Sequence, residues 1–381
     1  MQFFKGLQSE RIHPRYQTLV RTGRTSCSAP NIQQLPREGG FREMVAASPG
    51  HVLLTVDYSA IELRTLAVVC EKRFGFSRLG DIFRQKVDAH SYTAAVFAGL
   101  ELDDFLQLPK VERKTLRQRA KALGFGVPGG LGAKSLVAYA KQSYGVTMTL
   151  EEAEDFRQLL ITKVYPELEL YLAEDGIGIL AEALNVDAKT VGLYFDERFL
   201  GAAKKVVKGV PERADGTPYK QSSIDRVWLQ LQALNKNPML TPKLQRKETG
   251  TDLFRKLFWS PVTTTTGRRR AYVGFSQARN TPFQGMAADG AKLALWRLFR
   301  AGFRTVAFIH DEVVIELPEA SHWNDETQQV CDIMKEAMQD VMQSDIPVEV
   351  EFSITERWYK NAEVVRDSGG KLRLWEPVST G

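Results

Sequence analysis

The stretch Val52–Arg64 reads VLLTVDYSAIELR and decides how the rest of the sequence is interpreted. An apolar run ends at Asp57, and the apolar residues after it, beginning with Ile61, recur at the spacing of a helix. We therefore predict a strand, a turn and a helix, with Asp57 where a buried strand reaches the surface and Glu62 about one turn into the helix. A carboxylate at the end of a strand suits a metal ligand.

A second acidic stretch, Arg304–Pro318, reads RTVAFIHDEVVIELP. Two β-rich runs flank His310, Asp311 and Glu312, which predicts a β-hairpin with acidic residues at its tip. Taken alone, each stretch has an ordinary explanation, because aspartate at strand ends makes Asx turns and acidic residues are common in hairpin turns. Only their combination with further motifs favours catalysis.

The composition is that of a folded protein. The chain has 381 residues, of which 43% are hydrophobic, so it has room for one large domain or two to three smaller ones. Its net charge of +5 says little about partners, but Arg11–Arg37 holds five arginines and no acidic residue. Such clustering of positive charge near the candidate site is typical of nucleic-acid contact.

The three cysteines, Cys27, Cys70 and Cys331, are far apart in the sequence and show no CxxC spacing. They predict neither a disulfide framework nor a zinc site, and a reducing cytoplasm is the default location. The sequence shows no signal peptide and no run near the roughly 20 apolar residues of a membrane span, so we expect no membrane association.

A third stretch, Arg117–Gly130, reads RQRAKALGFGVPGG and stands between the two acidic ones. The three stretches, in this order, resemble motifs A, B and C of the family A DNA polymerases, the DNA polymerase I family. Motif A of that family reads DYSxIELR, which Asp57–Arg64 matches, and motif C is a His-Asp-Glu triplet between apolar strands, which His310–Glu312 matches. The resemblance implies an α+β fold: a right-hand polymerase core with an antiparallel-sheet palm and helical fingers.

The resemblance also implies a division of the chain. We expect the N-terminal part of the palm with motif A at 1–70, the fingers with the motif B helix at 71–175, a basic insertion at 176–260 and the C-terminal part of the palm with motif C at 261–381. The insertion is either a solvated excursion or a further nucleic-acid contact. Neither the exonuclease domains of the family nor most of its thumb is expected, so we predict no proofreading, and the insertion or an accessory subunit would grip the duplex.

The activity that the resemblance implies is template-directed addition of dNTPs to a primer 3′-hydroxyl. Two Mg²⁺ ions stabilise the charge on the entering and leaving oxygens in such reactions, and magnesium accepts one or two carboxylates plus phosphate oxygens. Asp57 and Asp311 are the implied metal ligands, with the backbone carbonyl of Tyr58, and Glu312 is an auxiliary catalytic residue. The cytoplasm of a bacterium, or of a phage or plasmid host, is the expected setting.

A helix with basic residues on one face precedes the glycine-rich end of motif B. The stripe runs from Lys110 through Arg117 to Lys121, and Phe125 continues it. A charged stripe is ordinarily the solvent side of a helix. By resemblance it is the nucleotide-binding face of the fingers, where Arg117 and Lys121 hold phosphates, Lys121 takes part in catalysis and Phe125 stacks on the incoming base.

Three further residues, Tyr58, His90 and Glu62, are assigned to the nucleotide by resemblance. His90 follows Asp88, the predicted N-cap of a helix, and would touch the triphosphate, although a histidine in a first turn is ordinarily a surface residue. Glu62 would occupy the space that a ribose 2′-hydroxyl needs. That glutamate, with Glu312 after the His-Asp pair, separates the chain from single-subunit phage RNA polymerases and favours DNA as the product.

The primer-template is the expected macromolecular partner. Two segments are similar to the family's TGR…PNxQN and NxPxQGxxAD elements, and arginine and amide side chains suit the minor-groove acceptors present at every base pair. The residues implied to contact DNA are Arg24, Asn31, Gln33, Asn280, Gln284 and His310.

The sequence departs from the family pattern in motif B, where Gly124 replaces an asparagine and Gly129 replaces a tyrosine. That tyrosine stacks at the template position, so its loss is expected to affect template positioning and to spare the phosphate contacts.

Local signals predict a capping box at Thr149 and Glu152, and a helix that starts with Thr281 as N-cap and Pro282 as first residue.

Two rival functions remain open. A non-catalytic DNA-binding remnant of a polymerase would account for the lost tyrosine, but it has no need of the aspartates. A metal-dependent nuclease or phosphodiesterase would account for the aspartates, but not for the helix around Lys121 or for Glu62.

Overall fold

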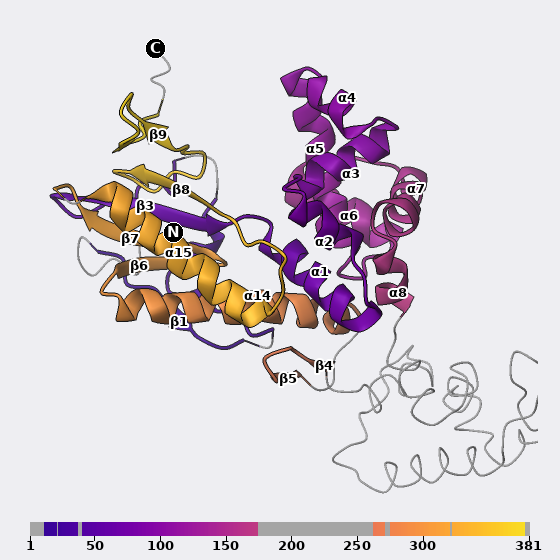
Figure 1. Cartoon of the computed structure of the whole chain (residues 1–381), viewed down its shortest axis with the longest axis horizontal. Coiled ribbons are helices and arrows are strands. Elements are labelled where there is room, and N and C mark those ends of the chain that lie inside the picture. Colours follow the sequence, from indigo (N-terminus) through magenta and orange to yellow (C-terminus); the bar gives the residue numbers. More distant parts are fainter. Residues whose placement is uncertain are drawn as a thin grey trace, which may run out of the picture. The chain divides into compact units, whose positions relative to one another are not determined.

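The computed structural model describes residues 11–20, 22–36, 40–173, 262–270, 275–320 and 322–377 (Figure 1). Its contacts divide the chain into two compact units. Unit 1 holds the described residues up to Tyr92, Thr264–Arg268 and those from Pro282 onward. Unit 2 holds the described residues of Thr93–Thr263 and Arg269–Thr281. The insertion predicted at 176–260 lies outside the described residues.

Unit 1 is built on a four-stranded antiparallel sheet with the strand order β6-β7-β3-β8. In chain order its strands are β3 (His51–Tyr58), β6 (Arg304–Ile309), β7 (Glu312–Pro318) and β8 (Val350–Thr355). β3 lies between β7 and β8, so both of its edges are paired, and the successive residues Leu53 and Leu54, which point to opposite faces, are both buried. The predicted strand, the predicted hairpin and the α+β class are confirmed.

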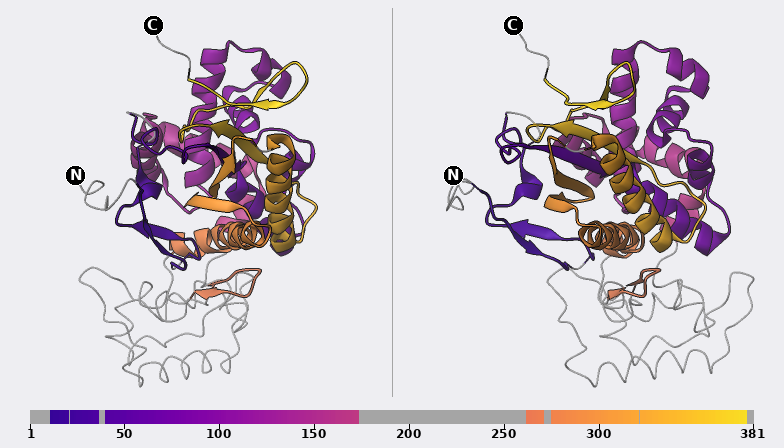
Figure 2. Two further views of the ribbon diagram at one scale, coloured as in Figure 1. Left: turned by 90° about the vertical axis from the view of Figure 1, so that its left-hand side faces the viewer. Right: turned by 60° about the vertical axis from the view of Figure 1, so that its left-hand side comes forward.

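Helices cover this sheet, and Figure 2, in which α14 is seen nearly end-on, shows α14 and α15 alongside the strands. The helices of unit 1 are α1 (Ile61–Phe74), α2 (Arg78–Arg84), the start of α3 (Ala89–Ala98), α14 (Phe275–Arg300) from Pro282 onward, and α15 (Trp323–Met342). The apolar stripe of α15, with Met334 and Met338 fully buried, faces β3 and β8. Helix α1 is tied to α14 by Thr65, whose hydroxyl donates to the carbonyl of Phe283 at 3.0 Å.

The predicted start of α14 is wrong. The helix begins at Phe275, and Pro282 lies inside it. Proline has no N–H to give to the preceding turn, so a helix normally ends or starts there. Here the helix continues through the proline, and two side chains just before it bond back to the preceding turn: the Thr281 hydroxyl donates to the carbonyl of Gln277 at 2.6 Å, and the Asn280 amide donates to that of Ser276 at 2.8 Å.

The N-terminal segment braces the edge of the sheet. It forms β1 (Arg15–Gln17), β2 (Ser26–Ser28) and the 3₁₀ turn η2 (Ile32–Gln34). The Tyr16 hydroxyl accepts from the backbone N–H of Phe308 and donates to its carbonyl, both at 3.1 Å, and burial raises the pKa of Tyr16 to about 12. At the other chain end, β9 (Val365–Arg366) and β10 (Leu372–Arg373) form a small hairpin that no pattern in the sequence indicated.

Unit 2 is mainly helical. Besides the rest of α3 it contains α4 (Leu102–Gln107), α5 (Lys110–Gly126), α6 (Ala133–Tyr144), α7 (Leu150–Leu159), the π-turn η3 (Leu160–Val164), α8 (Glu167–Ala173) and the short pair β4 (Val262–Thr263) and β5 (Arg269–Arg270). The predicted capping box is confirmed: the Thr149 hydroxyl accepts from Glu152 N–H, and the Glu152 carboxylate accepts from Thr149 N–H. The predicted N-cap of α3 is confirmed as well, since Asp88 accepts from Ser91 N–H at 2.8 Å.

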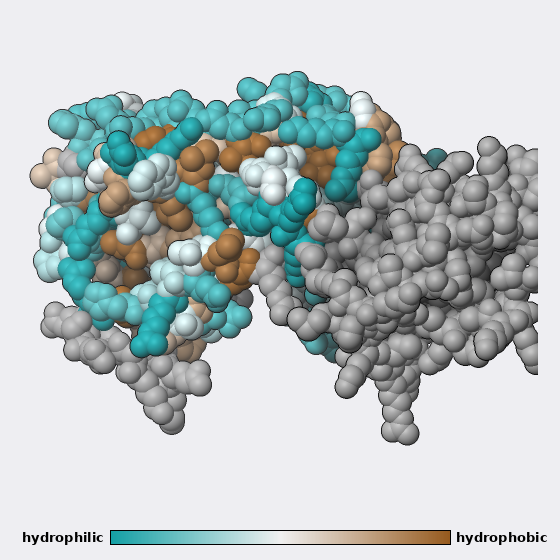
Figure 3. Space-filling view, turned by 90° about the horizontal axis from the view of Figure 1, so that it is seen from below, coloured by the Kyte–Doolittle hydropathy of each residue, from teal (hydrophilic) through white to brown (hydrophobic). Residues whose placement is uncertain are grey.

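Seen from below in Figure 3, hydrophobic side chains interrupt the hydrophilic surface on the left-hand part of the molecule. On α14, Trp296 and Phe299 are 56% and 69% exposed, and their rings stack at a centroid distance of 6.1 Å. Within the described ranges no helix has the length and apolar character needed to cross a bilayer.

Candidate active site

The two predicted acidic stretches meet at one end of the sheet of unit 1. The paired residues Val56 and Val313 join β3 to β7, and the next residues along these strands are Asp57 and Glu312. His310 and Asp311 form the connection between β6 and β7, closed by the pair Ile309–Glu312. Sheet pairing therefore brings together the carboxylates of Asp57, Asp311 and Glu312.

His310 occupies the exposed first position of this connection with a φ of 61°. A left-handed conformation is uncommon for a residue other than glycine, and it is what a tight hairpin turn between two antiparallel strands requires. The turn fixes the direction in which Asp311 leaves the backbone. The structure thus places His310 at the surface beside the carboxylates, as its predicted role requires.

The charge of Asp57 affects the titration of Asp311. Burial, followed by the negative charge of Asp57, raises the pKa of Asp311 to about 7, whereas Arg24 and Lys360 oppose this rise. Two carboxylates held near each other in a partly dehydrated place disfavour double ionisation unless a cation joins them. Lys360 supplies one such cation, paired with Asp57.

A lysine and a tryptophan that no sequence motif indicated belong to the same cluster. Lys360 Nζ lies 3.1 Å from Asp57 Oδ2 and 3.1 Å from Glu312 Oε2, while Trp358 Nε1 donates to Glu312 Oε1 at 2.6 Å. Burial disfavours the charge of Lys360, but the two carboxylates outweigh it, and the pKa of Lys360 is raised. Both oxygens of the buried Glu312 are therefore engaged by the protein.

The chain after β8 holds these two residues in place. Arg357 pairs with Ala46 as an isolated bridge, and the Trp358 N–H donates to the carbonyl of Val45 at 2.9 Å. The Arg42 guanidinium lies 4.4 Å from the centre of the Trp358 ring. The only signal in the sequence for these two residues was the run RWYK shortly after β8, and this run does not show where the segment pairs.

Glu62 is held by two predicted DNA-contacting residues. It is the second residue of α1, nearer the helix start than predicted, and its carboxylate forms an ion pair with Arg24. The amide of Gln284, from α14, donates to Glu62 Oε2 at 3.4 Å. Arg24, Glu62 and Gln284 thus form one polar group in unit 1.

Three other predicted site residues of unit 1 have buried side chains. The buried Tyr58 hydroxyl donates at 2.7 Å to the carbonyl of Met334, a residue of α15. Only the backbone of Tyr58 is therefore available to a ligand. The Gln33 amide donates to Thr25 Oγ1 and to the carbonyl of Phe308. His90 is 5% exposed and is no surface residue. Asn31, by contrast, is exposed.

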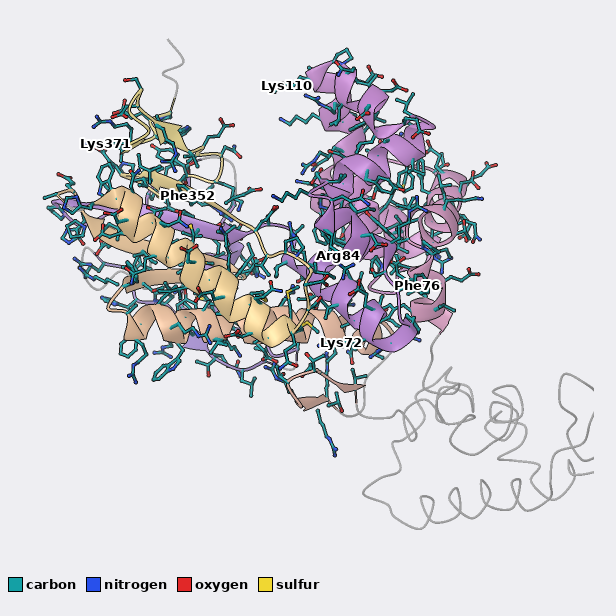
Figure 4. All side chains as sticks on the ribbon, in the orientation of Figure 1. Lys72, Phe76, Arg84, Lys110, Phe352 and Lys371 are labelled. Carbon is teal, nitrogen blue, oxygen red and sulfur yellow. The ribbon has the colours of Figure 1, made fainter. Side chains whose placement is uncertain are left out.

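The remaining predicted residues belong to unit 2. Arg117, Lys121 and Phe125 are half-buried on α5, whose first residue, Lys110, is labelled in Figure 4. Asn280 donates to the carbonyl of Gly129 at 3.3 Å. A Cβ at Gly129, where the family pattern has its tyrosine, would lie 2.9 Å from Asn280 Oδ1. The Asn280 amide therefore lies where a larger residue 129 would place its side chain.

The donor set of unit 1 fits Mg²⁺. Asp57, Asp311 and the backbone carbonyl of Tyr58 are hard oxygen donors, and magnesium needs only one or two carboxylates when a substrate supplies phosphate oxygens. In the part of the chain that the structure describes, no group of three or more His, Cys, Asp or Glu has the arrangement of a metal site. Glu312, whose two oxygens bind Trp358 and Lys360, is not counted in this donor set.

Comparison with known sequences identifies the family of this α+β chain. The model of "DNA polymerase family A" matches residues 2–175 and 240–360. The chain belongs to DNA polymerase family A.

Among its relatives is DNA polymerase I of Aquifex aeolicus, which is 28% identical over 366 residues, covering 93% of this chain and 47% of that protein. The thermostable DNA polymerase I of Thermus filiformis is 27% identical over 357 residues, covering 91% of this chain and 32% of that protein. The chain thus spans half or less of the length of these relatives.

The fold is also that of a solved structure, the POL domain of Pol1 from M. smegmatis in complex with DNA primer-template and dNTP. The TM-score is 0.57 with 22% sequence identity, and the match covers 94% of this chain and 50% of that one. This similarity supports the α+β class and the polymerase-core architecture.

Proposed function

We propose that this chain is a template-directed DNA polymerase that adds dNTPs to the 3′-hydroxyl of a primer. The observation that carries the proposal is the meeting of Asp57 and Asp311 at one end of the sheet, close enough for the charge of Asp57 to raise the pKa of Asp311. Membership of family A supports the same activity, and its bacterial relatives support the cytoplasm of a bacterium, or of a phage or plasmid host, as the setting.

Asp57, Asp311 and the Tyr58 carbonyl would hold two Mg²⁺ ions. When bound, such ions stabilise the negative charge on the entering and leaving oxygens of an in-line displacement. For Asp311 to act as a ligand its carboxyl must lose the proton that it holds below about pH 7. Glu312, bound to Trp358 and Lys360, would shape the site without ligating.

The nucleotide contacts are proposed from membership of family A. Arg117 and Lys121 of α5, together with His90, are the cations proposed to neutralise the triphosphate, and Phe125 would stack on the base. Glu62, held by Arg24 and Gln284, would exclude a 2′-hydroxyl. This last role makes the product DNA.

Primer-template DNA is the proposed partner. Arg24 and Gln284 are minor-groove donors already grouped around Glu62, and Asn31 and His310 are exposed on the same unit. The M. smegmatis structure, a complex with DNA primer-template and dNTP, supports this choice. Gln33 and Asn280, whose amides bond to backbone carbonyls, would contact DNA only after exchanging these bonds.

Primer extension tests the proposal. A primed DNA template is incubated with Mg²⁺ and either four dNTPs or four rNTPs, and the chain is compared with Asp311→Ala and with Asp104→Ala, an exposed carboxylate of α4. We expect extension by dNTPs, its loss in Asp311→Ala and its retention in Asp104→Ala. Equal extension by Asp311→Ala would contradict the proposed role of Asp311.

The amide of Asn280 beside Gly129 favours a second candidate, a DNA-binding protein without catalysis, because no tyrosine can stack on the template from position 129. Retained primer-template binding with no extension by the unaltered chain would support this candidate. Adding host extract then separates it from a polymerase that needs an accessory subunit, because only the latter regains extension.

A further inference from the structure

The ammonium group of Lys360 lies between two carboxylates of the candidate active site. Its Nζ is 3.1 Å from Asp57 Oδ2 and 3.1 Å from Glu312 Oε2. The side chains of Lys360 and Asp57 are 28% and 33% exposed, whereas that of Glu312 is only 4% exposed. The ammonium thus makes one bond to a solvent-accessible carboxylate and one to a buried carboxylate.

Of the two ion pairs of Lys360, the one with Glu312 is supported by more neighbouring contacts than the one with Asp57. Glu312 also accepts from the Trp358 indole at 2.6 Å, and the Trp358 backbone is fixed to Val45. A buried carboxylate that loses its counter-charge is strongly destabilising, so Glu312 needs Lys360. Asp57 is half-exposed, and water or another cation can replace the lysine there.

Lysine carries a compact charge on a flexible stem, which allows it to release one partner while keeping another. In a direct bond to Asp57 Oδ2, its ammonium takes the place that a cation bound to this oxygen would take. We propose that Lys360 is an internal counter-ion of the metal-free protein, which a divalent cation displaces from Asp57 while the lysine stays bound to Glu312.

The inference rests on the proposed metal-binding role of Asp57 and Asp311. It gives Glu312 a definite role, because this carboxylate then anchors the counter-ion and does not ligate the metal. It also predicts that Lys360 weakens metal binding by the free protein, because the cation has to compete with a charge that is already in place.

Binding of Mn²⁺, used in place of Mg²⁺, is measured by electron paramagnetic resonance of the free ion, without DNA or nucleotide. The variants are Lys360→Met, which keeps most of the stem and removes the charge, and Lys360→Arg, which keeps the charge. Lys371→Met is the control, since Lys371 is an exposed lysine on the β9–β10 hairpin (Figure 4). Asp57→Ala reports on the metal site itself, and circular dichroism checks the folding of each variant.

We expect Lys360→Met to bind Mn²⁺ more tightly by roughly tenfold, as removal of a unit positive charge beside a ligand implies. Lys360→Arg and Lys371→Met should stay within about twofold of the unaltered chain, because both keep the charge at this site. In the presence of a chelator, Lys360→Met should melt at a lower temperature than the unaltered chain. Added Mn²⁺ should raise the melting temperature of Lys360→Met by more than it raises that of the unaltered chain.

Weaker Mn²⁺ binding by Lys360→Met would show that the lysine supports Asp57 and does not compete, and unchanged binding would show no coupling. Either result, with Asp57→Ala deficient in binding, overturns the inference about Lys360 and leaves the metal site intact. Unaltered Mn²⁺ binding by Asp57→Ala would instead refute the metal site on which the proposed function depends.

Discussion

The indole N–H of Trp358 donates a 2.6 Å hydrogen bond to Glu312 Oε1, while Lys360 binds the other oxygen of the same carboxylate. The sequence predicts Glu312 as an auxiliary residue next to the proposed metal ligand Asp311. Both oxygens of Glu312 are bonded to side chains that follow β8. Glu312 therefore links the start of β7 to the segment after β8.

Trp358→Phe should destabilise the fold. The substitution keeps an aromatic ring near Arg42 but removes the donor, leaving one oxygen of the buried Glu312 without this bond. The free energy of unfolding should fall by about 1–3 kcal/mol, measured by urea denaturation. Trp375→Phe, which alters a half-buried tryptophan whose ring is tilted against that of Tyr359, is the matched control. Equal stability of the two variants would show that the bond to Glu312 contributes little.

Asp311→Asn should stabilise the metal-free protein at high pH. The pKa of Asp311 is raised from 3.8 to about 7 in the fold, so the stability that its proton supplies is complete below pH 3.8 and is lost as the pH rises through 7. In EDTA, the increase in the free energy of unfolding caused by Asp311→Asn should be larger at pH 8 than at pH 5, by on the order of 2 kcal/mol. Asp104→Asn should show no such pH dependence, and a gain independent of pH would contradict the raised pKa.

Gly129→Ala should destabilise unit 2 through a single neighbour. The added Cβ would lie 2.9 Å from Asn280 Oδ1, so the Asn280 amide has to leave its bond to the Gly129 carbonyl. We expect a cost of about 1–2 kcal/mol.

In the background of Asn280→Ala the same substitution should cost little, because the clashing amide is absent. The coupling energy from the four proteins, obtained by denaturation, measures the interaction. Additive costs would mean that Asn280 is not what keeps residue 129 small.

Glu62→Ala should relax the choice of sugar. The carboxylate is fixed by Arg24 and Gln284, and its removal opens space for a 2′-hydroxyl. The preference for dNTP over rNTP, measured as a ratio of kcat/KM in primer extension, should fall at least about tenfold. Glu363→Ala, an exposed glutamate after β8, should leave the ratio unchanged. An unchanged ratio in Glu62→Ala would remove Glu62 from sugar selection.

Much of the sheet of unit 1 could be predicted, because its signals are local. Asp57 ends an apolar run, and apolar residues at helical spacing follow it. His310–Glu312 stands between two β-rich runs. Each stretch therefore shows its strands, its turn and its acidic residue within a few positions of sequence. The family pattern then indicated that the two acidic stretches meet. Their pairing through Val56 and Val313 confirms the strands on which this expectation depended.

The residues that were missed depend on contacts between distant segments. Lys360 reaches Asp57 only because the chain after β8 pairs with residues near Ala46, which no local pattern shows. The start of α14 was wrong for a different reason: Pro282 is a strong local signal of a helix start, but the helix continues through it, with Asn280 and Thr281 bonded back to the preceding turn. The burial of His90 likewise follows from packing around α3.

The position of β3 between β7 and β8 has a consequence for biosynthesis. β3 is made well before both of its partners, so its pairings in the sheet are non-local and must wait for distant segments. Asp57 can join Asp311 only after β7 has left the ribosome, and its lysine partner follows later still. The nascent chain therefore carries Asp57 as an isolated carboxylate while the long segment between β3 and β7 is made, and the cluster is complete only once Lys360 has followed β8.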